Sequence, residues 1–271
     1  MKIGINRWTL PGSLSLRECF DLVKRTGFDS IEINIAEDGE LTPNTPEADV
    51  RALTVAAAEA GIEISSVSTG LGWKYPITSA DPDVRARGLA NISSQLKAAS
   101  WLGVDTILVV PGVVSADIAY DDAYARALET IKLAAPEAEA LGVSIGIENV
   151  WNKFLLSPLE FARFIDEVGS THVGAYFDVG NVLVYGFPEQ WIKILGSRIR
   201  KIHVKDFRAG IGNITGFCNP LQGDVAWYKV KAALEAVGYD GYITGEVDGY
   251  RTEPELGLKH IADSLRTVFG S

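Results

Sequence analysis

The sequence feature that most constrains the fold is a phrase that recurs along the chain. A helix-forming run ends in a glycine, and a β-branched run begins a few residues later, as in RTGFDSIEI, EAGIEISSV, WLGVDTILV, ALGVSIGIE and AVGYDGYIT. Glycine readily takes the left-handed conformation that ends many helices, and β-branched residues favour strands. We therefore expect helices to end at Gly27, Gly61, Gly103, Gly142 and Gly238. The phrase predicts alternating helices and strands.

This alternation runs through the whole chain. The expected strands are residues 2–8, 30–35, 63–69, 106–110, 144–150, 173–179, 199–206 and 242–248. The expected helices are residues 15–26, 46–60, 81–102, 121–141, 157–168, 188–195, 227–237 and 254–269. Eight such units without a linker favour an α/β fold, a (β/α)8 TIM barrel that forms a single domain over residues 1–271. No GxGxxG motif follows the first strand, which disfavours an open dinucleotide-binding sheet.

Charge and cysteine content narrow the classes of partner. The net charge of −10 predicts that the chain binds no nucleic acid, because a phosphate backbone needs a basic surface. Cys19 and Cys218 form no CxxC pair, which favours a reducing compartment. The first residues, MKIGINRWTL, are too polar for a signal peptide, and no run of about 18 apolar residues could span a membrane. We therefore expect a cytoplasmic protein with no membrane partner.

Four polar side chains are expected at the same end of four neighbouring strands. Side chains in a barrel strand alternate between the interior and the surrounding helices. In SIGIENV the isoleucines face the helices and Glu148 faces the interior, and Asp178, His203 and Glu246 have the same phase in VGAYFDV, IRKIHVKD and YITGEVD. The same alternation predicts that Val247 faces the helices. Each of the four polar residues lies late in its strand, at the barrel mouth where active sites of this fold lie.

These four residues are candidate ligands of a divalent metal. Three carboxylates a few ångströms apart repel each other unless a cation compensates. An oxygen-rich set with one nitrogen predicts Mn²⁺, with Mg²⁺, Co²⁺ or Zn²⁺ as alternatives. Taken singly, a carboxylate at a strand end usually caps a loop, and a lone histidine is usually a hydrogen-bonded polar residue. The coincidence of strand, face and depth at all four positions favours the metal.

Several segments carry a family resemblance. IENVWNKFLLSP, YFDVGNVL, KIHVKDF, LQGDVAW and GYDGYITGE resemble the xylose isomerase-like TIM barrels, a superfamily of sugar phosphate isomerases and epimerases. The nearest resemblance is to ketose 3-epimerases and to L-ribulose-5-phosphate or L-xylulose-5-phosphate 3-epimerases. It covers essentially the whole chain, and it implies that Glu148, Asp178, His203 and Glu246 hold the metal. Free-sugar epimerases carry Asp-x-x-His, whereas the segment from Asp178 to Asn181 resembles the phosphate-ketose branch.

The resemblance implies an isomerase that acts on a small molecule, a ketose or ketose phosphate. A metal-stabilised cis-enediolate would form, and Glu148 and Glu246 would move protons on opposite faces, which gives 3-epimerisation. A lyase or dehydratase of a keto-sugar or keto-inositol, and a non-catalytic sugar-binding protein, are the alternatives. An endonuclease IV-like repair enzyme would need a histidine-rich trinuclear zinc site, and the chain has three histidines. A homo-oligomer, either dimer or tetramer, is compatible with the resemblance.

Further residues are expected to bind the substrate. Trp8 ends the first strand, and Trp73 lies in the TGLGWKYP loop, where an aromatic wall could stack on a sugar. Glu32 faces the interior by its alternation with the isoleucines of SIEINI. Plain packing is the alternative for the tryptophans. Residues that follow strand ends could hold hydroxyl groups or a phosphate, or could be solvated surface groups: Lys153, Asn181, Lys205 and Arg208.

Overall fold

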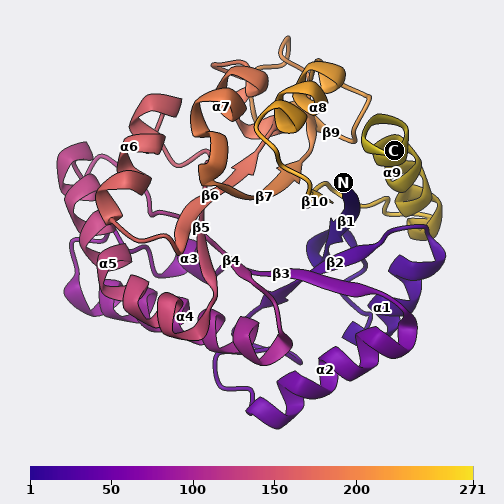
Figure 1. The fold of residues 1–271 in the computed structure, drawn as a ribbon, viewed down its shortest axis with the longest axis horizontal. Coiled ribbons are helices and arrows are strands. Elements are labelled where there is room, and N and C mark those ends of the chain that lie inside the picture. The colour runs from indigo at the N-terminus through magenta and orange to yellow at the C-terminus, as the bar shows by residue number, and fades with distance from the viewer. Residues whose placement is uncertain (271) are drawn as a thin grey trace.

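Eight parallel strands close into a barrel in the computed structural model, which describes residues 1–270 (Figure 1). Their order around the barrel is β1-β10-β7-β6-β5-β4-β3-β2. The barrel strands are β1 (Lys2–Asn6), β2 (Ser30–Ile35), β3 (Glu63–Thr69), β4 (Thr106–Val109), β5 (Ser144–Glu148), β6 (Val173–Asp178), β7 (Ile199–Val204) and β10 (Tyr242–Gly245). The predicted (β/α)8 barrel is confirmed.

Helices surround the barrel on its outer side (Figure 1). They are α1 (Leu16–Arg25), α2 (Glu47–Ala60), α3 (Leu71–Lys74), α4 (Pro82–Leu102), α5 (Tyr120–Leu141), α6 (Pro158–Val168), α7 (Pro188–Leu195), α8 (Trp227–Ala236) and α9 (Pro254–Phe269). Short 3₁₀ turns add η1 (Arg7–Thr9), η2 (Gly180–Val182), η3 (Gly196–Arg198) and η4 (Ile214–Gly216). The short α3 was not predicted, because one helical turn carries no periodic pattern.

Local signals in the sequence fix where these helices begin and end. Ser15 forms a capping box with Glu18 at the start of α1, and the Ser157 side chain accepts a hydrogen bond from the Glu160 backbone amide. The five glycines predicted to end helices all have positive φ, between 65° and 97°. Sequence therefore predicted helix ends well, whereas several strands end two or three residues earlier than predicted.

The core lies between the strands and the helices. Isoleucines from the strands are fully buried there: Ile3, Ile31, Ile107, Ile145, Ile202 and Ile243. The barrel interior holds mainly polar and small residues instead, together with the larger Leu108 and Tyr176. Gly146 leaves room for the ring of Tyr176 on the adjacent strand, because an added Cβ would lie 3.0 Å from that ring. The outward-apolar, inward-polar alternation therefore holds within most strands, with Leu108 of β4 as an inward apolar exception.

The strand register brings the candidate ligands to one level. Glu148 pairs with Tyr176 across β5 and β6, and Asp178 pairs with His203 across β6 and β7. His203 also pairs with Thr244 of β10, two residues before Glu246. Neighbouring parallel strands thus end in potential ligands at the same edge of the barrel.

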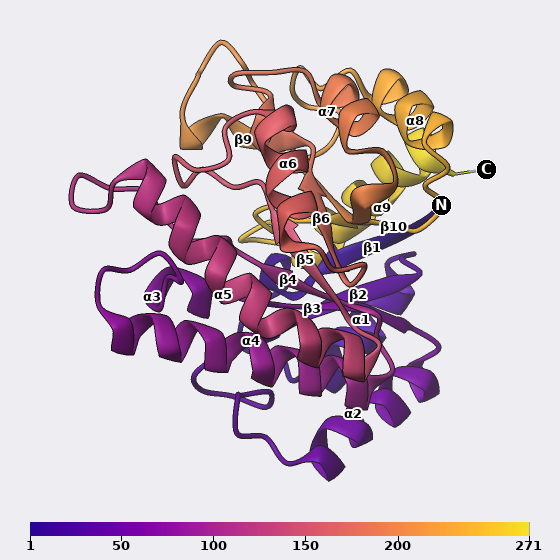
Figure 2. The same ribbon diagram turned by 60° about the vertical axis from the view of Figure 1, so that its left-hand side comes forward.

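A long excursion separates β7 from α8. It contains the small antiparallel pair β8 (Asp206–Phe207) and β9 (Phe217–Cys218), and Figure 2 shows it standing away from the barrel near β9. Gly216 and the ring of Phe217 pack against the ring of Phe207. This excursion forms one wall of the pocket described below. None of the helices in residues 1–270 combines the length and apolar character needed to cross a membrane.

Candidate metal centre and substrate pocket

The structure brings the four candidate ligands together at the barrel mouth. Glu148, Asp178, His203 and Glu246 each offer one ligand atom, and these atoms lie within 4.8 Å of one another. The first three side chains are buried and Glu246 is partly exposed. The Glu246 backbone amide donates to the Val204 carbonyl at 3.0 Å, which continues the β10–β7 pairing one residue beyond the strand. The structure therefore places these four side chains where side-chain alternation predicted them.

Asn149, which follows Glu148, fixes Asp178. Its side-chain oxygen accepts a hydrogen bond from the Asp178 amide, and its side-chain nitrogen donates to the Asp178 carbonyl, both at 2.8 Å. Asn181 adds a backbone hydrogen bond to Asp178 Oδ1 at 2.8 Å, and its own side chain donates to the Asn149 carbonyl. These bonds lock the ends of β5 and β6 together, so that two ligands share one rigid support.

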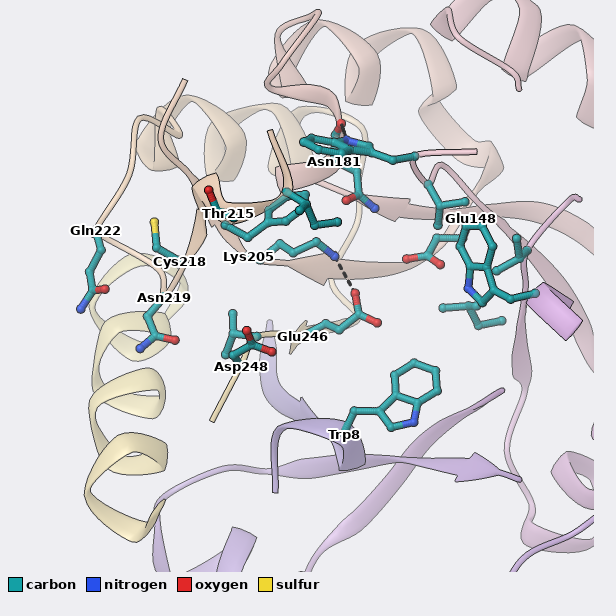
Figure 3. A pocket seen from close by; sticks show the side chains of 18 of the residues that line it. Trp8, Glu148, Asn181, Lys205, Thr215, Cys218, Asn219, Gln222, Glu246 and Asp248 are labelled. Carbon is teal, nitrogen blue, oxygen red and sulfur yellow. Dashed lines mark hydrogen bonds and ion pairs between the residues drawn. The ribbon is translucent and has the colours of Figure 1, made fainter. Parts of the chain in front are cut away.

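Gly180 allows Lys205 to approach this support. A Cβ at position 180 would lie 2.6 Å from both the Cγ and the carbonyl oxygen of Lys205. The Lys205 ammonium then lies 2.7 Å from Asp178 Oδ2 and 2.6 Å from Glu246 Oε2, and Figure 3 marks the ion pair with Glu246. Burial opposes the charged form of Lys205, but the surrounding carboxylates, Asp178 foremost, outweigh it and raise the pKa of the amine.

Glu32 lies beneath His203 in the barrel interior. Its Oε1 lies 2.8 Å from His203 Nε2 and also accepts a hydrogen bond from the Asn6 side chain, while its Oε2 accepts hydrogen bonds from Ser66 and Tyr176. Burial alone would raise the pKa of Glu32, but the charge and hydrogen bond of His203 and the two hydroxyl groups lower it to about 2. An ionised carboxylate at Nε2 holds the ring so that Nδ1 faces the ligand cluster.

Glu148 and Glu246 approach the other face of the histidine. His203 Nδ1 lies 3.3 Å from Glu148 Oε1 and 3.7 Å from Glu246 Oε2. Burial raises the pKa of Glu148 to about 7, and the nearby Glu246 charge adds to this, whereas the His203 hydrogen bond lowers it. The positive charges in the cluster therefore do not fully offset the negative charge of its carboxylates.

The donor set fits a divalent cation. Three carboxylates and one imidazole converge there. The charged amine of Lys205 already forms ion pairs with two of the carboxylates, Asp178 and Glu246. Oxygen-rich sites with one nitrogen suit Mn²⁺, Mg²⁺ or Co²⁺, and a carboxylate behind a ligating histidine is the usual support of such a site. Glu148, Asp178, His203 and Glu246 could thus hold the ion.

A pocket of about 900 Å³ opens over this cluster (Figure 3). It is lined by Trp8, Thr69, Trp73, Leu108, Val110, Glu148, Val150, Trp151, Asn181, Lys205, Ile214, Thr215, Phe217, Cys218, Asn219, Gln222, Glu246, Val247 and Asp248. In Figure 3 the excursion residues Thr215, Cys218, Asn219 and Gln222 lie on the side of Lys205 that is remote from Glu148. The pocket therefore has a metal end and a far end.

Four of the seven residues predicted to bind substrate lie on the pocket wall: Trp8, Trp73, Asn181 and Lys205. Three do not. Glu32 is fully buried beneath His203, Lys153 lies in an exposed turn with φ of 60°, and Arg208 is exposed and donates to the Gln222 carbonyl at 3.2 Å. The strand pattern gave the inward phase of Glu32 but not its depth, and a position after a strand end does not fix the direction of a loop side chain.

The prediction for Val247 holds in part. Val247 packs against the hydrophobic core but also lines the pocket, because β10 ends at Gly245 and strand alternation stops there. Other pocket and support residues were not predicted: Asn6, Ser66, Asn149, Tyr176, Asn219, Gln222 and Asp248. Alternation in VGAYFDV could have identified Tyr176 as inward-facing, since it lies two residues before Asp178.

Comparison with known sequences identifies the family. A sequence model described as xylose isomerase-like TIM barrel matches residues 20–268. The chain belongs to this family. The matched range contains all four candidate ligands and most of the pocket wall, so the family assignment covers the site as well as the barrel.

Individual relatives are more distant. SgbU of Escherichia coli is 28% identical over 251 residues, which are 89% of this chain and 86% of SgbU. The L-ribulose-5-phosphate 3-epimerase UlaE of Salmonella paratyphi A is 26% identical over 242 residues, which are 88% of this chain and 84% of UlaE. Both alignments span most of the two proteins compared.

Solved structures confirm the fold. An L-ribulose 3-epimerase superposes with a TM-score of 0.84 at 20% identity, covering 99% of this chain and 94% of the other. A D-psicose 3-epimerase in the presence of D-fructose gives 0.83 at 21% identity, with both chains fully covered. At these identities the likeness concerns the fold alone.

Proposed function

We propose that the protein is a metal-dependent sugar epimerase that inverts the carbon beside a ketose carbonyl, with Glu148 and Glu246 as the proton-moving groups. The observation that carries this proposal is that both glutamates line the same pocket and approach the same atom, His203 Nδ1. The relative UlaE, which is named a 3-epimerase, supports the reaction class.

Glu148, Asp178, His203 and Glu246 would hold a divalent cation, which we propose to be Mn²⁺. Such an ion, when bound, supplies positive charge next to the carbonyl and so makes the adjacent C–H proton acidic enough for a carboxylate. Asp178 and His203 serve only as ligands in this scheme. Their rigid supports, Asn149 and Glu32, keep the ligand atoms in place.

The two glutamates then divide the proton transfers. One removes the proton from one face of the carbon, and the other returns a proton to the opposite face, which inverts the configuration. One base working on a single face would instead move the carbonyl and give an aldose–ketose isomerase. The half-exposed Trp8 and Trp73 flank the pocket and limit the access of water to the reacting carbon.

Incubation of ketoses and ketose phosphates with Mn²⁺ in D₂O tests the proposal. We expect epimer formation with deuterium at the inverted carbon, and loss of both after treatment with EDTA. Glu246→Gln and Glu148→Gln should each abolish net conversion, while the remaining glutamate still exchanges its own substrate proton with solvent. Product that has lost water would indicate a dehydratase, and full activity without metal would refute the proposal.

A further inference from the structure

The far end of the pocket differs from the metal end in chemistry. Its walls come from the β8–β9 excursion, with Thr215, Asn219 and Gln222, and from the segment after β10, with Asp248 (Figure 3). Nothing at this end is needed to hold a metal or to move a proton. Its side chains are available to recognise a part of the substrate remote from the reacting carbon.

The charge of the pocket wall opposes a phosphate. Among the lining residues, all within the described part of the chain, Lys205 is the one cation, and both Asp178 and Glu246 already hold its amine. Asp248 adds a carboxylate that makes no ion pair within residues 1–270. A phosphate dianion needs cationic groups or converging N–H donors, and it would meet a further negative charge here.

The polar groups of the far end suit hydroxyls. The side chains of Asn219, Gln222 and Asp248 make no hydrogen bond within residues 1–270, although all three line the pocket. A carboxamide offers both a donor and an acceptor, as a sugar hydroxyl does, and a carboxylate accepts from a hydroxyl. Gln222 and Asp248 are exposed and Asn219 is half-buried, so these groups can exchange bonds to water for bonds to an uncharged polyol without breaking a bond inside the protein.

Size and aromatic surface indicate more than one sugar ring. The pocket, at about 900 Å³, is near the upper end of the range of about 300–1,000 Å³ for drug-sized ligands, and a single pentose or hexose is much smaller. Trp8 and Trp73 are 50% and 48% exposed, and the Trp151 and Phe217 rings, whose centroids lie 4.8 Å apart, also line the pocket. Aromatic faces of this kind cover the apolar C–H faces of sugars.

The resemblance of the Asp178–Asn181 motif to a phosphate-ketose branch has a structural explanation that needs no phosphate. Gly180 admits the backbone of Lys205, and the Asn181 side chain donates to the Asn149 carbonyl at 2.9 Å. Both residues support the ligand Asp178. The motif is therefore explained by its support of Asp178 and does not by itself indicate a phosphate at the far end of the pocket.

We infer that the substrate is an uncharged saccharide of at least two units: a ketose at the metal end, joined by a glycosidic bond to a second unit that contacts Asn219, Gln222 and Asp248. This inference rests on the proposed function for the ketose end. It assigns the far end as a glycosyl subsite, and it excludes a terminal phosphate as the main determinant of binding.

Three probes that differ only at O6 of one ketose test the subsite: D-fructose, D-fructose 6-phosphate and isomaltulose, which carries a glucosyl group there. Calorimetric titration of the Mn²⁺-loaded protein should give at least ten-fold tighter binding of isomaltulose than of the phosphate. The variant N219A/Q222A should lower the affinity for isomaltulose relative to fructose about ten-fold, because two neutral hydrogen bonds are lost. Arg208→Ala, which removes an exposed guanidinium outside the pocket wall, should change the affinity for fructose 6-phosphate less than two-fold.

The outcomes separate the subsite from the reaction. Tighter binding of fructose 6-phosphate, no binding of isomaltulose, or a large loss of phosphate affinity in R208A overturns the glycosyl subsite. Deuterium uptake from D₂O is measured on the same samples. If isomaltulose binds as expected but takes up no deuterium, the proposed reaction fails while the subsite stands. If the phosphate is epimerised faster than isomaltulose, the reaction stands and the subsite falls.

Discussion

The two ends of the pocket are built in opposite ways. At the metal end every charged side chain has partners: Asn149 holds Asp178, Glu32 holds His203, and Lys205 joins Asp178 to Glu246. At the far end the side chains of Asn219, Gln222 and Asp248 line open space, with no hydrogen bond inside residues 1–270. The side chains of the metal end are thus held in place by the protein itself, whereas those of the far end can gain hydrogen-bond partners from a ligand.

This difference separates the chemical step from recognition. The fixed residues lie on strand ends, where backbone pairing limits their movement, and proton transfer needs that accuracy. The open residues lie on an excursion and on the segment after β10, where substitutions disturb little of the barrel. Changes of substrate within such a family can therefore occur at the far end without loss of the reaction. The following variants test that division.

The largest effect is expected at the two glutamates. Glu148→Gln and Glu246→Gln should each reduce turnover by about 10²–10⁴-fold, the usual contribution of a general acid or base. The double variant should be little worse than either single one, because both proton transfers are needed for one inversion. Steady-state rates of epimer formation give the measurement. Net conversion close to the wild-type rate with one glutamate replaced would end the two-base scheme.

Lys205→Met should destabilise the metal-free protein by about 3 kcal/mol, because it leaves two carboxylates without their buried cation. Added Mn²⁺ should restore much of that loss by binding the folded state. Chemical denaturation with EDTA and with Mn²⁺ measures both values. A stability equal to that of the wild type in EDTA would show that the lysine is not needed as a counter-charge.

Glu32→Gln should weaken Mn²⁺ binding by about 10–100-fold, the typical cost of losing the support behind a ligating histidine. Glu63→Gln is the matched control, because Glu63 is the first residue of β3, remote from the barrel mouth, and pairs with Lys2 on the surface. Calorimetry gives the affinities, and the absorption spectrum of the Co²⁺-loaded protein reports the ligand geometry. If both variants bind Mn²⁺ alike, Glu32 does not orient the histidine.

The smallest effect is expected on the free energy of unfolding when side chains of the far end are removed. N219A/Q222A should leave the free energy of unfolding within about 0.5 kcal/mol of the wild-type value, because neither side chain has a partner within the described residues. Urea denaturation measures it. A clearly larger loss would mean that these residues support the fold, and the contrast between the two ends would then be wrong.

The sequence predicted the barrel and its ligand cluster because both depend on short-range periodicity. Glycine caps mark the helix ends, and alternation in each strand gives the inward phase of Glu148, Asp178, His203 and Glu246. In a closed barrel, inward-facing residues at the same depth on neighbouring strands lie close together. Strand ends at the mouth were predicted too long, since the last residues before a loop keep a strand-like composition after pairing has stopped.

The rest of the site depends on contacts between distant segments. Glu32 and His203 are 171 residues apart, and the depth of Glu32 follows from strand stagger rather than from its own strand. The far wall comes from an excursion whose path has no periodicity, so Asn219 and Gln222 could not be placed from sequence. Lys205 was identified as a mouth residue, but the close approach that Gly180 permits is a property of the packed strands.

The position of Lys205 has a consequence for how the protein is assembled in the cell. Many small metalloproteins fold only when the metal arrives, because their clustered ligands repel one another without it. Here the chain brings a cation of its own to two of those ligands, so folding does not have to wait for the metal supply. Loading of the proposed metal would then be an exchange in the finished protein, in which an incoming ion displaces an amine. The ions available when that exchange occurs, rather than those present at the ribosome, would decide which metal the enzyme carries.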